Sequence, residues 1–168
     1  MRMILVVSGT GGDSRAASAR ALVESRGLGI LCTNSKRPPG YPFASVTPYA
    51  ADTLGRPVLL LSRLAVHSKN LVQDSRASLL VFEESTESAP LDSARLNLLG
   101  DVALIREPEL DDARARYLAR HPDSAQWAEF GDFAFYRIDV VDIYYVGGFG
   151  AMGWVSPDDY RGAPGLRK

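Results

Sequence analysis

Short runs of apolar and β-branched residues, separated by turn signals, recur along this chain and limit the folds that it can adopt. The runs lie at residues 28–33, 41–50, 57–61, 77–82, 95–105 and 133–146. Two prolines and a glycine within residues 34–40 predict a hairpin between the first two runs. No helical stretch joins two runs at the spacing of a parallel β–α–β unit. The pattern therefore predicts a mainly β fold, an antiparallel barrel of about six strands with helices attached at its edges.

Details within the runs make this prediction more specific. In residues 41–50 the odd-numbered side chains are rings and hydroxyls, and they face one way in a strand. Gly100 interrupts the run at 95–105, which predicts a β-bulge or a sharp bend. Helices are expected at residues 15–26, 64–73, 108–120 and 123–130. In the second of these helices, the residues expected to be buried are Leu64, Leu71 and Val72.

The chain has the length of a single domain. Its 168 residues, of which 46% are hydrophobic, suffice for one core. We expect residues 1–12 to be an N-terminal extension, residues 13–155 to be the barrel domain and residues 156–168 to be a loosely ordered tail.

Charge and composition argue against several kinds of partner. The 19 basic residues nearly balance the 20 acidic ones, so no overall field draws the chain to nucleic acid or to an anionic membrane. No apolar run approaches the length of about 20 residues that spans a bilayer. Cys32 is the only cysteine, and His67 and His121 are the only histidines, which argues against an internal disulfide and against a metal site rich in these residues. We expect a cytoplasmic protein without a metal site.

Residues 62–70 carry a dense group of polar side chains at the point where a predicted strand ends and a helix begins. The segment holds Arg63 and Lys69 together with a histidine, two serines and an asparagine. The first amide groups of a helix have no partner within it, so a phosphate bound there gains hydrogen bonds and a favourable helix dipole. An anion site is therefore one hypothesis. The alternative is that Ser62 caps the helix and the other side chains form its solvated face.

Six short segments follow one another in a recognisable order. They are GLGILCT at 27–33, GYPFASV at 40–46, SRLAVHSKN at 62–70, DSRASLL at 74–80, RLNLLG at 95–100 and GGFG at 147–150. Together they resemble the pyridoxamine 5′-phosphate oxidase-like FMN-binding split-barrel family, most closely its haem-utilisation branch. The resemblance implies a six-stranded Greek-key split barrel that forms a homodimer, with FMN in a groove between the subunits. It also implies a flavin-dependent oxidoreductase with a small-molecule substrate, haem being one candidate.

The same resemblance implies which residues bind the cofactor. They are Ser45, Val46, Thr47, Ser62, His67, Ser68, Lys69, Asn70 and Arg95. The residues around the helix start would surround the phosphate and the ribityl chain, the backbone of residues 45–47 would face the flavin ring, and Arg95 would pair with the phosphate. Phe149 and Trp154 would lie on the substrate side, although core packing is the commoner role of aromatics near a glycine turn. No catalytic residue is assigned, because the flavin itself carries the redox chemistry.

The sequence also permits other folds, functions and cofactors. Residues 4–7 followed by Ser-Gly-Thr-Gly-Gly and a helix are similar to the start of a nucleotide-binding fold, although a proline turn stands where that fold needs a second parallel strand with an acidic end. The barrel is alternatively a non-catalytic module that binds flavin without turnover, or a protein-interaction dimer. A deazaflavin is an alternative to FMN, and His67 is alternatively a half-buried structural residue of its helix.

Overall fold

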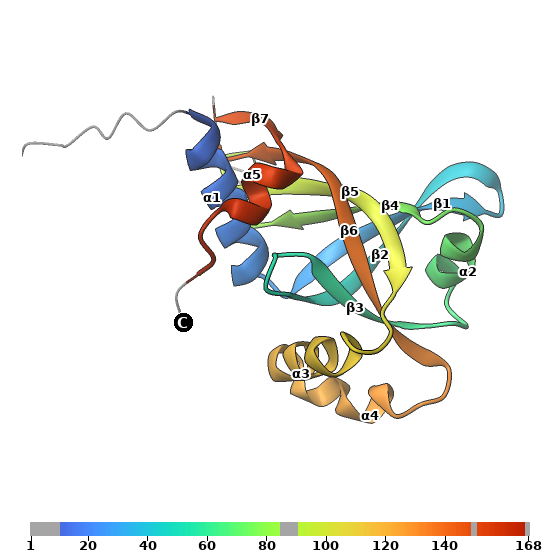
Figure 1. Cartoon of the computed structure of the whole chain (residues 1–168). Helices are drawn as coiled ribbons and strands as arrows, with labels where there is room; N and C mark the ends of the chain where they lie inside the picture. Colours follow the sequence, from blue (N-terminus) through green and yellow to red (C-terminus); the bar gives the residue numbers. More distant parts are fainter. Residues whose placement is uncertain (1–10, 85–90, 149–150, 167–168) are drawn as a thin grey trace, which may run out of the picture.

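Seven antiparallel strands form one sheet that closes on itself as a barrel (Figure 1). The computed structural model describes residues 11–84, 91–148 and 151–166. The strands are β1 (Leu28–Lys36), β2 (Pro39–Ala51), β3 (Pro57–Ser62), β4 (Arg76–Phe82), β5 (Arg95–Leu104), β6 (Phe133–Val146) and β7 (Met152–Val155). Their order is β3-β2-β1-β4-β5-β6-β7, and β3 also pairs with β6. Strands β1 to β6 therefore close the barrel, as predicted, and β7 extends the sheet beyond β6.

Helices cover the barrel at its ends and along one side (Figure 1). They are α1 (Gly11–Ser25), α2 (Val66–Gln73), α3 (Leu110–Arg120), α4 (Ala125–Ala128) and α5 (Pro157–Gly162), with a short 3-10 turn, η1, at Pro122–Ser124. α1 packs against α5 at one end of the molecule, and α2 lies at the other end. None of the helices in the described ranges is both long and apolar enough to cross a membrane. Residues 4–7, on which the nucleotide-fold hypothesis depends, lie outside the described residues. Every strand pairing within the described ranges is antiparallel, which contradicts the parallel sheet that this hypothesis requires.

The alternation predicted for the second strand determines which residues face the barrel interior. On β2, Thr47 and Tyr49 are buried, whereas Val46 is 68% exposed on the outer face. The predicted bulge is also present, because the register of β5 against β6 shifts at Gly100. A Cβ atom at Gly100 would lie 2.4 Å from the carbonyl oxygen of Asp139, so only glycine lets the two strands approach this closely.

The segment that follows β7 differs from the loosely ordered tail expected from its composition. Residues 157–162 form α5, and the side chain of Ser156 caps this helix. Tyr160 is fully buried and donates a hydrogen bond to the carbonyl oxygen of Gly55 at 2.8 Å. The guanidinium of Arg20 on α1 lies 5.6 Å from the centre of the Tyr160 ring. The buried side chain of Tyr160 therefore holds α5 in place, although the prolines and glycines of this segment predicted loose order.

Polar rather than apolar side chains of α2 are buried. Leu64, which precedes the observed start of α2, is 69% exposed, and Val72 on α2 is 88% exposed, so the predicted burial of these two residues is wrong. Leu71 packs against the core as predicted. The buried residues of α2 are Ser68 and Asn70. The reason is that α2 packs mainly on β1, where polar groups need hydrogen-bond partners.

Candidate functional site

The N-terminus of α2 is the feature on which the predicted anion site depends. The helix begins at Val66, and its N-cap residue, Ala65, makes no side-chain capping hydrogen bond. The hypothesis that Ser62 caps this helix is therefore wrong, because the helix starts further along the chain than predicted. The first backbone N–H groups of a helix have no partner within it. This end of α2 is thus able to donate hydrogen bonds to a ligand.

Two buried polar atoms in the first turn of α2 have no hydrogen-bond partner among the described residues. They are His67 Nε2 and Ser68 Oγ. The other ring nitrogen, His67 Nδ1, lies 3.2 Å from Ser45 Oγ on β2, which orients the ring. Burial lowers the pKa of the His67 imidazole below its ordinary value, which favours the neutral ring. Since a buried polar atom without a partner costs about 1–3 kcal/mol, a ligand oxygen at this turn would recover free energy.

The loop that leads into α2 is held by the turn before β6. Ser62 Oγ donates to Asp132 Oδ2 at 2.5 Å and accepts from the backbone N–H of Leu64 at 3.1 Å. The backbone N–H of Arg63 donates to the carbonyl oxygen of Asp132 at 2.8 Å, and its guanidinium donates to that of Gly131. No local pattern points to Asp132, which lies 70 residues from Ser62 in the sequence. Only the Gly131-Asp132 pair, as a turn signal, indicates that a loop is present there.

Three other predicted site residues differ in their burial, since Asn70 on α2 and Thr47 on β2 are buried and Lys69 on α2 is exposed. Asn70 Oδ1 accepts from the backbone N–H of Lys36 at 2.9 Å, and Asn70 Nδ2 donates to Thr33 Oγ1 at 3.0 Å. These two bonds tie α2 to β1 and occupy both ends of the amide. Thr47 is buried inside the barrel, whereas Lys69 is exposed. Asn70 therefore positions the helix, and Lys69 is the cation nearest in sequence to the two unpartnered atoms.

A row of outward-facing side chains crosses six neighbouring strands. The strand registers align Val46, Ile30, Leu80, Asn97, Tyr144 and Trp154. Trp154 is 57% exposed, and its ring meets that of Tyr144 with centroids 5.1 Å apart. Leu28 and Val141 expose further apolar surface on these strands. An extended apolar face of this kind is typical of a surface that binds another molecule.

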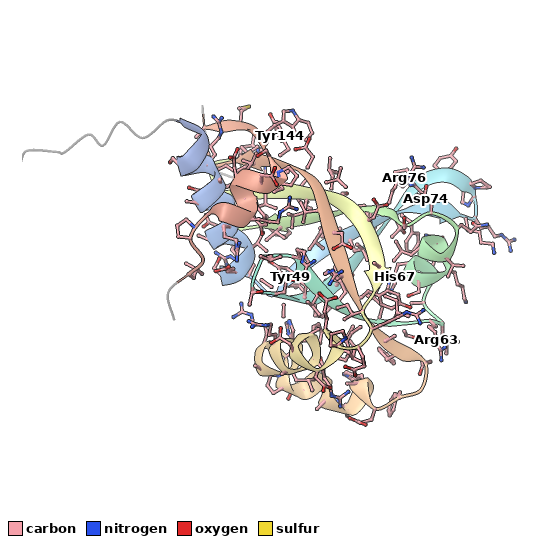
Figure 2. The ribbon with its side chains drawn as sticks, viewed as in Figure 1. Tyr49, Arg63, His67, Asp74, Arg76 and Tyr144 are labelled. Atoms are coloured by element: carbon pink, nitrogen blue, oxygen red, sulfur yellow. The ribbon has the colours of Figure 1, made fainter. Side chains whose placement is uncertain are left out.

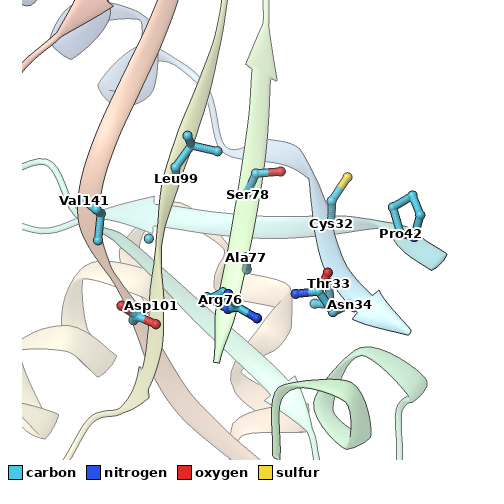
Figure 3. A pocket seen from close by; sticks show the side chains of 11 residues that line it. Cys32, Thr33, Asn34, Pro42, Arg76, Ala77, Ser78, Leu99, Asp101 and Val141 are labelled. Atoms are coloured by element: carbon cyan, nitrogen blue, oxygen red, sulfur yellow. The ribbon is translucent and has the colours of Figure 1, made fainter. Parts of the chain in front are cut away.

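A pocket of about 410 Å³ opens on the same outer face (Figure 3). Cys32, Leu99 and Val141 supply part of its wall, and Arg76 lies at one end of it. Arg76 pairs with Asp74 at 2.7 Å (Figure 2), and this hydrogen-bonded pair holds the pKa of the Asp74 carboxyl well below its usual range. The positive charge of Arg76 is thus already offset. The pocket therefore suits a flat apolar group better than an anion.

Arg95 lies far from α2 within one chain. It begins β5 and pairs with Phe82 at the end of β4. Its guanidinium donates to the carbonyl oxygens of Leu91 at 3.0 Å and Ser93 at 3.3 Å. The start of β5 and α2 lie at opposite ends of the barrel (Figure 1), so a single chain does not bring Arg95 to the first turn of α2. Phe149, the other predicted residue on the substrate side, lies outside the described residues.

The sequence matches a known family over almost the whole described region. The family described as "CREG, beta-barrel" matches residues 11–162, which run from the first residue of α1 to the last residue of α5. The chain belongs to the CREG β-barrel family. This chain is similar to the chloroplastic non-canonical haem oxygenase HOZ of Arabidopsis thaliana. It is 36% identical over 148 residues, which cover 86% of this chain and 45% of HOZ.

Solved structures share the fold. A haem-binding protein from Mycobacterium smegmatis superposes with a TM-score of 0.80 and 31% identity, over 96% of this chain and 63% of that protein. A Clostridium acetobutylicum protein of the pyridoxinephosphate oxidase family superposes with a TM-score of 0.66 and 14% identity, over 88% of this chain and 98% of that one. At 14% identity, this second similarity supports the fold and not a shared function. The predicted split-barrel fold is confirmed, and the haem-binding neighbour fits the branch of the family that the resemblance named. This chain spans less than two thirds of the length of HOZ and of the mycobacterial protein.

Proposed function

We propose that this protein binds FMN and holds its phosphate at the N-terminus of α2. The observation that carries the proposal is the pair of buried, unpartnered atoms His67 Nε2 and Ser68 Oγ beside the uncapped start of the helix. A phosphate accepts hydrogen bonds from side-chain donors and from helix N–H groups together, and the helix dipole favours its negative charge. Lys69, exposed on the same helix, adds positive charge. The donor set thus fits a phosphate monoester.

In this proposal the flavin lies between two copies of the chain. Arg95 begins β5, and the start of β5 lies at the other end of the barrel from α2 (Figure 1). In this proposal Arg95 therefore reaches the phosphate only from a second copy. The apolar outer row that includes Val46 and Trp154 offers the surface on which two copies would meet. A homodimer therefore completes the site.

A bound flavin supplies hydride or electron transfer, and the protein supplies binding and orientation. We accordingly assign a flavin-dependent oxidoreductase that acts on a small molecule in the cytoplasm. His67 and Ser68 hold the phosphate, Ser45 fixes the ring of His67, and the backbone of residues 45–47 faces the flavin ring. No side chain of this protein is assigned a proton transfer.

Haem is the second candidate ligand, and the relatives favour it. The Arabidopsis relative is named a haem oxygenase, and the mycobacterial structure is that of a haem-binding protein. The apolar outer face with its pocket of about 410 Å³ suits a planar tetrapyrrole as well as a flavin ring. Haem would be the substrate of the flavin reaction or would bind in place of the flavin.

Absorption spectra and titrations of the purified protein test these assignments. We expect a yellow preparation that releases FMN on denaturation. The apoprotein should bind FMN about a hundredfold more tightly than riboflavin, because riboflavin lacks the phosphate and its charge-assisted hydrogen bonds. Equal affinity for the two flavins contradicts the phosphate site, and no uptake of either contradicts the flavin assignment. Uptake of haemin without any flavin supports the second candidate.

Substitutions of Arg95 and Lys69 test the phosphate site that we place between two copies of the chain. Arg106→Ala, at an exposed position, is the control. Arg95→Ala should weaken FMN binding more than Lys69→Ala does, because a guanidinium pairs with two phosphate oxygens at once. Equal affinity in wild type and Arg95→Ala removes Arg95 from the site. Mixing Arg95→Ala with Ser68→Ala protein should restore flavin uptake, since each hybrid dimer keeps one intact site.

Flavin reduction by NAD(P)H, followed by reoxidation with oxygen or a haem acceptor, tests catalysis. Turnover supports the oxidoreductase. A bound flavin that no reductant or candidate substrate changes supports the non-catalytic binding module.

A further inference from the structure

Residues of α1, of α3 and of the segment after α5 line a second hollow. The helices α1 and α3 lie on a different side of the molecule from α2 (Figure 1). We call this hollow the α1–α3 cleft. Its volume is about 1120 Å³, which is ample for a small organic molecule. The turn between β2 and β3 and the segment after α5 complete its walls. The proposed flavin site uses none of the residues that line it.

Small apolar side chains form part of the lining of the α1–α3 cleft. Ala115 and Ala119 lie one turn apart on α3, so both face the cleft. Ala50 and Ala51 come from the end of β2, and Ala163 follows α5. These five methyl groups present apolar surface without a long side chain in the way. The body of a ligand that rests on them should itself be apolar.

Two arginines of the cleft have no carboxylate closer than 3.9 Å among the described residues. Arg26 Nε is buried without a hydrogen-bond partner in that part of the chain, and Glu83 is its only carboxylate neighbour, at 3.9 Å. Arg120 donates to the carbonyl oxygen of Ser25 at 2.8 Å, which uses one of its five N–H groups. A Cβ atom at Gly27 would lie 2.7 Å from Arg120 Nε, so Arg120 packs directly beside the residue that follows Arg26. The two guanidinium groups thus flank the end of α1.

The carboxylates of the α1–α3 cleft are already paired. The pairs are Arg20 with Glu24 at 2.5 Å, Arg56 with Asp52 at 2.6 Å and Arg116 with Asp112 at 2.6 Å. These pairs offset the negative charge of the lining. Arg26 and Arg120 are left as the positive charge that an anion would meet.

We propose that the α1–α3 cleft binds a small organic anion. Its carboxylate or phosphate group pairs with Arg26 and Arg120, and its apolar body rests on the alanines of α3 and β2. An anionic oxygen supplies the acceptor that the buried Arg26 Nε lacks, and charge-assisted hydrogen bonds of this kind are strong. The alanines offer no side-chain hydrogen bond, so the charged group determines which molecules bind. This binding does not depend on the proposed flavin site.

Nuclear magnetic resonance titrations of the ¹⁵N-labelled full chain test the proposal. The probes are phenyl phosphate and benzoate, with benzyl alcohol as the neutral control. We expect both anions to shift the backbone signals of Ala115, Ala119 and Arg120 saturably, and benzyl alcohol to leave them unchanged. Shifts confined to α2 would support the flavin phosphate site and overturn the cleft proposal. No saturable shift on α1 or α3 would also overturn it.

Two variants separate the charge from the apolar surface. The double variant Arg26→Gln/Arg120→Gln should weaken phenyl phosphate binding by about tenfold or more, whereas Arg106→Gln, outside the cleft, should not. Ala119→Met keeps both cations but fills the cleft from the surface of α3, and it should also weaken binding. Thermal unfolding shows whether each variant is folded. Wild-type affinity in either folded variant would contradict the proposal.

Discussion

Removing the Ser68 hydroxyl should make the flavin-free protein more stable and its flavin affinity lower. Ser68 is 5% exposed, and its Oγ is buried without a partner among the described residues. A buried hydroxyl without a hydrogen bond costs about 1–3 kcal/mol. Alanine also has a higher helix propensity than serine, by a few tenths of a kcal/mol. Ser68→Ala should therefore stabilise the flavin-free protein by about 1 kcal/mol, which corresponds to a rise in Tm of about 2–4 °C for a chain of this size.

The same hydroxyl donates to the phosphate in our account, so its loss has the opposite effect on binding. Ser68→Ala should weaken FMN binding by about tenfold, the equivalent of one charge-assisted hydrogen bond. Urea denaturation of the flavin-free protein gives the stability change, and fluorescence titration gives the affinity.

Ser62→Ala is the matched control. Ser62 Oγ donates to Asp132 at 2.5 Å and accepts from Leu64, so its removal should destabilise the protein by about 1–2 kcal/mol. If Ser68→Ala destabilises the flavin-free protein as much as Ser62→Ala does, the Ser68 hydroxyl has a structural role and is not available to a ligand. Unchanged FMN affinity in Ser68→Ala would refute its role at the phosphate.

Three further predictions concern the barrel and its attached elements. Gly100→Ala should lower the free energy of unfolding by more than about 2 kcal/mol in urea, because its Cβ would lie 2.4 Å from the carbonyl oxygen of Asp139; a near-neutral effect would mean that β5 and β6 separate easily there. Tyr160→Phe removes the hydrogen bond to the carbonyl oxygen of Gly55 and should cost about 1–2 kcal/mol in the same assay, whereas no change would mean that α5 is held by packing alone. Burial lowers the pKa of His67, so the unfolded chain takes up this proton first as the pH falls. The protonation of His67 therefore does not reduce the free energy of unfolding above its ordinary pKa of about 6.5, and it reduces it increasingly as the pH falls below that value. The urea midpoint of wild type should accordingly fall more steeply than that of His67→Gln in this range; parallel profiles would contradict the burial of the ring.

Local sequence patterns were sufficient to predict most of the barrel. The strand predicted at residues 133–146 has the observed bounds of β6, and the bulge at Gly100 lies where the glycine indicates. Alternation in β2 correctly separates the interior side chain of Tyr49 from the outer side chain of Val46. Each of these features depends on neighbours in the sequence or on the period of a strand, so the sequence contains the necessary information.

The errors come from contacts between distant segments. Leu64 and Val72 were assigned to the core by their hydrophobicity, but α2 lies on β1 and buries Asn70 to satisfy Lys36 and Thr33. In the same way, the helical structure of α5 depends on contacts with α1 and with the turn before β3.

The candidate site was predicted only in part, for the same reason. His67 and Ser68 share the first turn of a helix, so a local motif brings them together. Asp132 holds Ser62 from 70 residues away, and the pattern around it predicts only a turn. The assigned role of Arg95 involves an assembly of two chains, which the fold of one chain does not determine.

A crystal structure of the protein grown with FMN would show where the flavin phosphate binds. We predict that phosphate oxygens lie within hydrogen-bond distance of Ser68 Oγ and His67 Nε2, at the first turn of α2, with Arg95 contributed by a second copy. Flavin bound with its phosphate elsewhere, or FMN absent from crystals grown at saturating concentration, would contradict it.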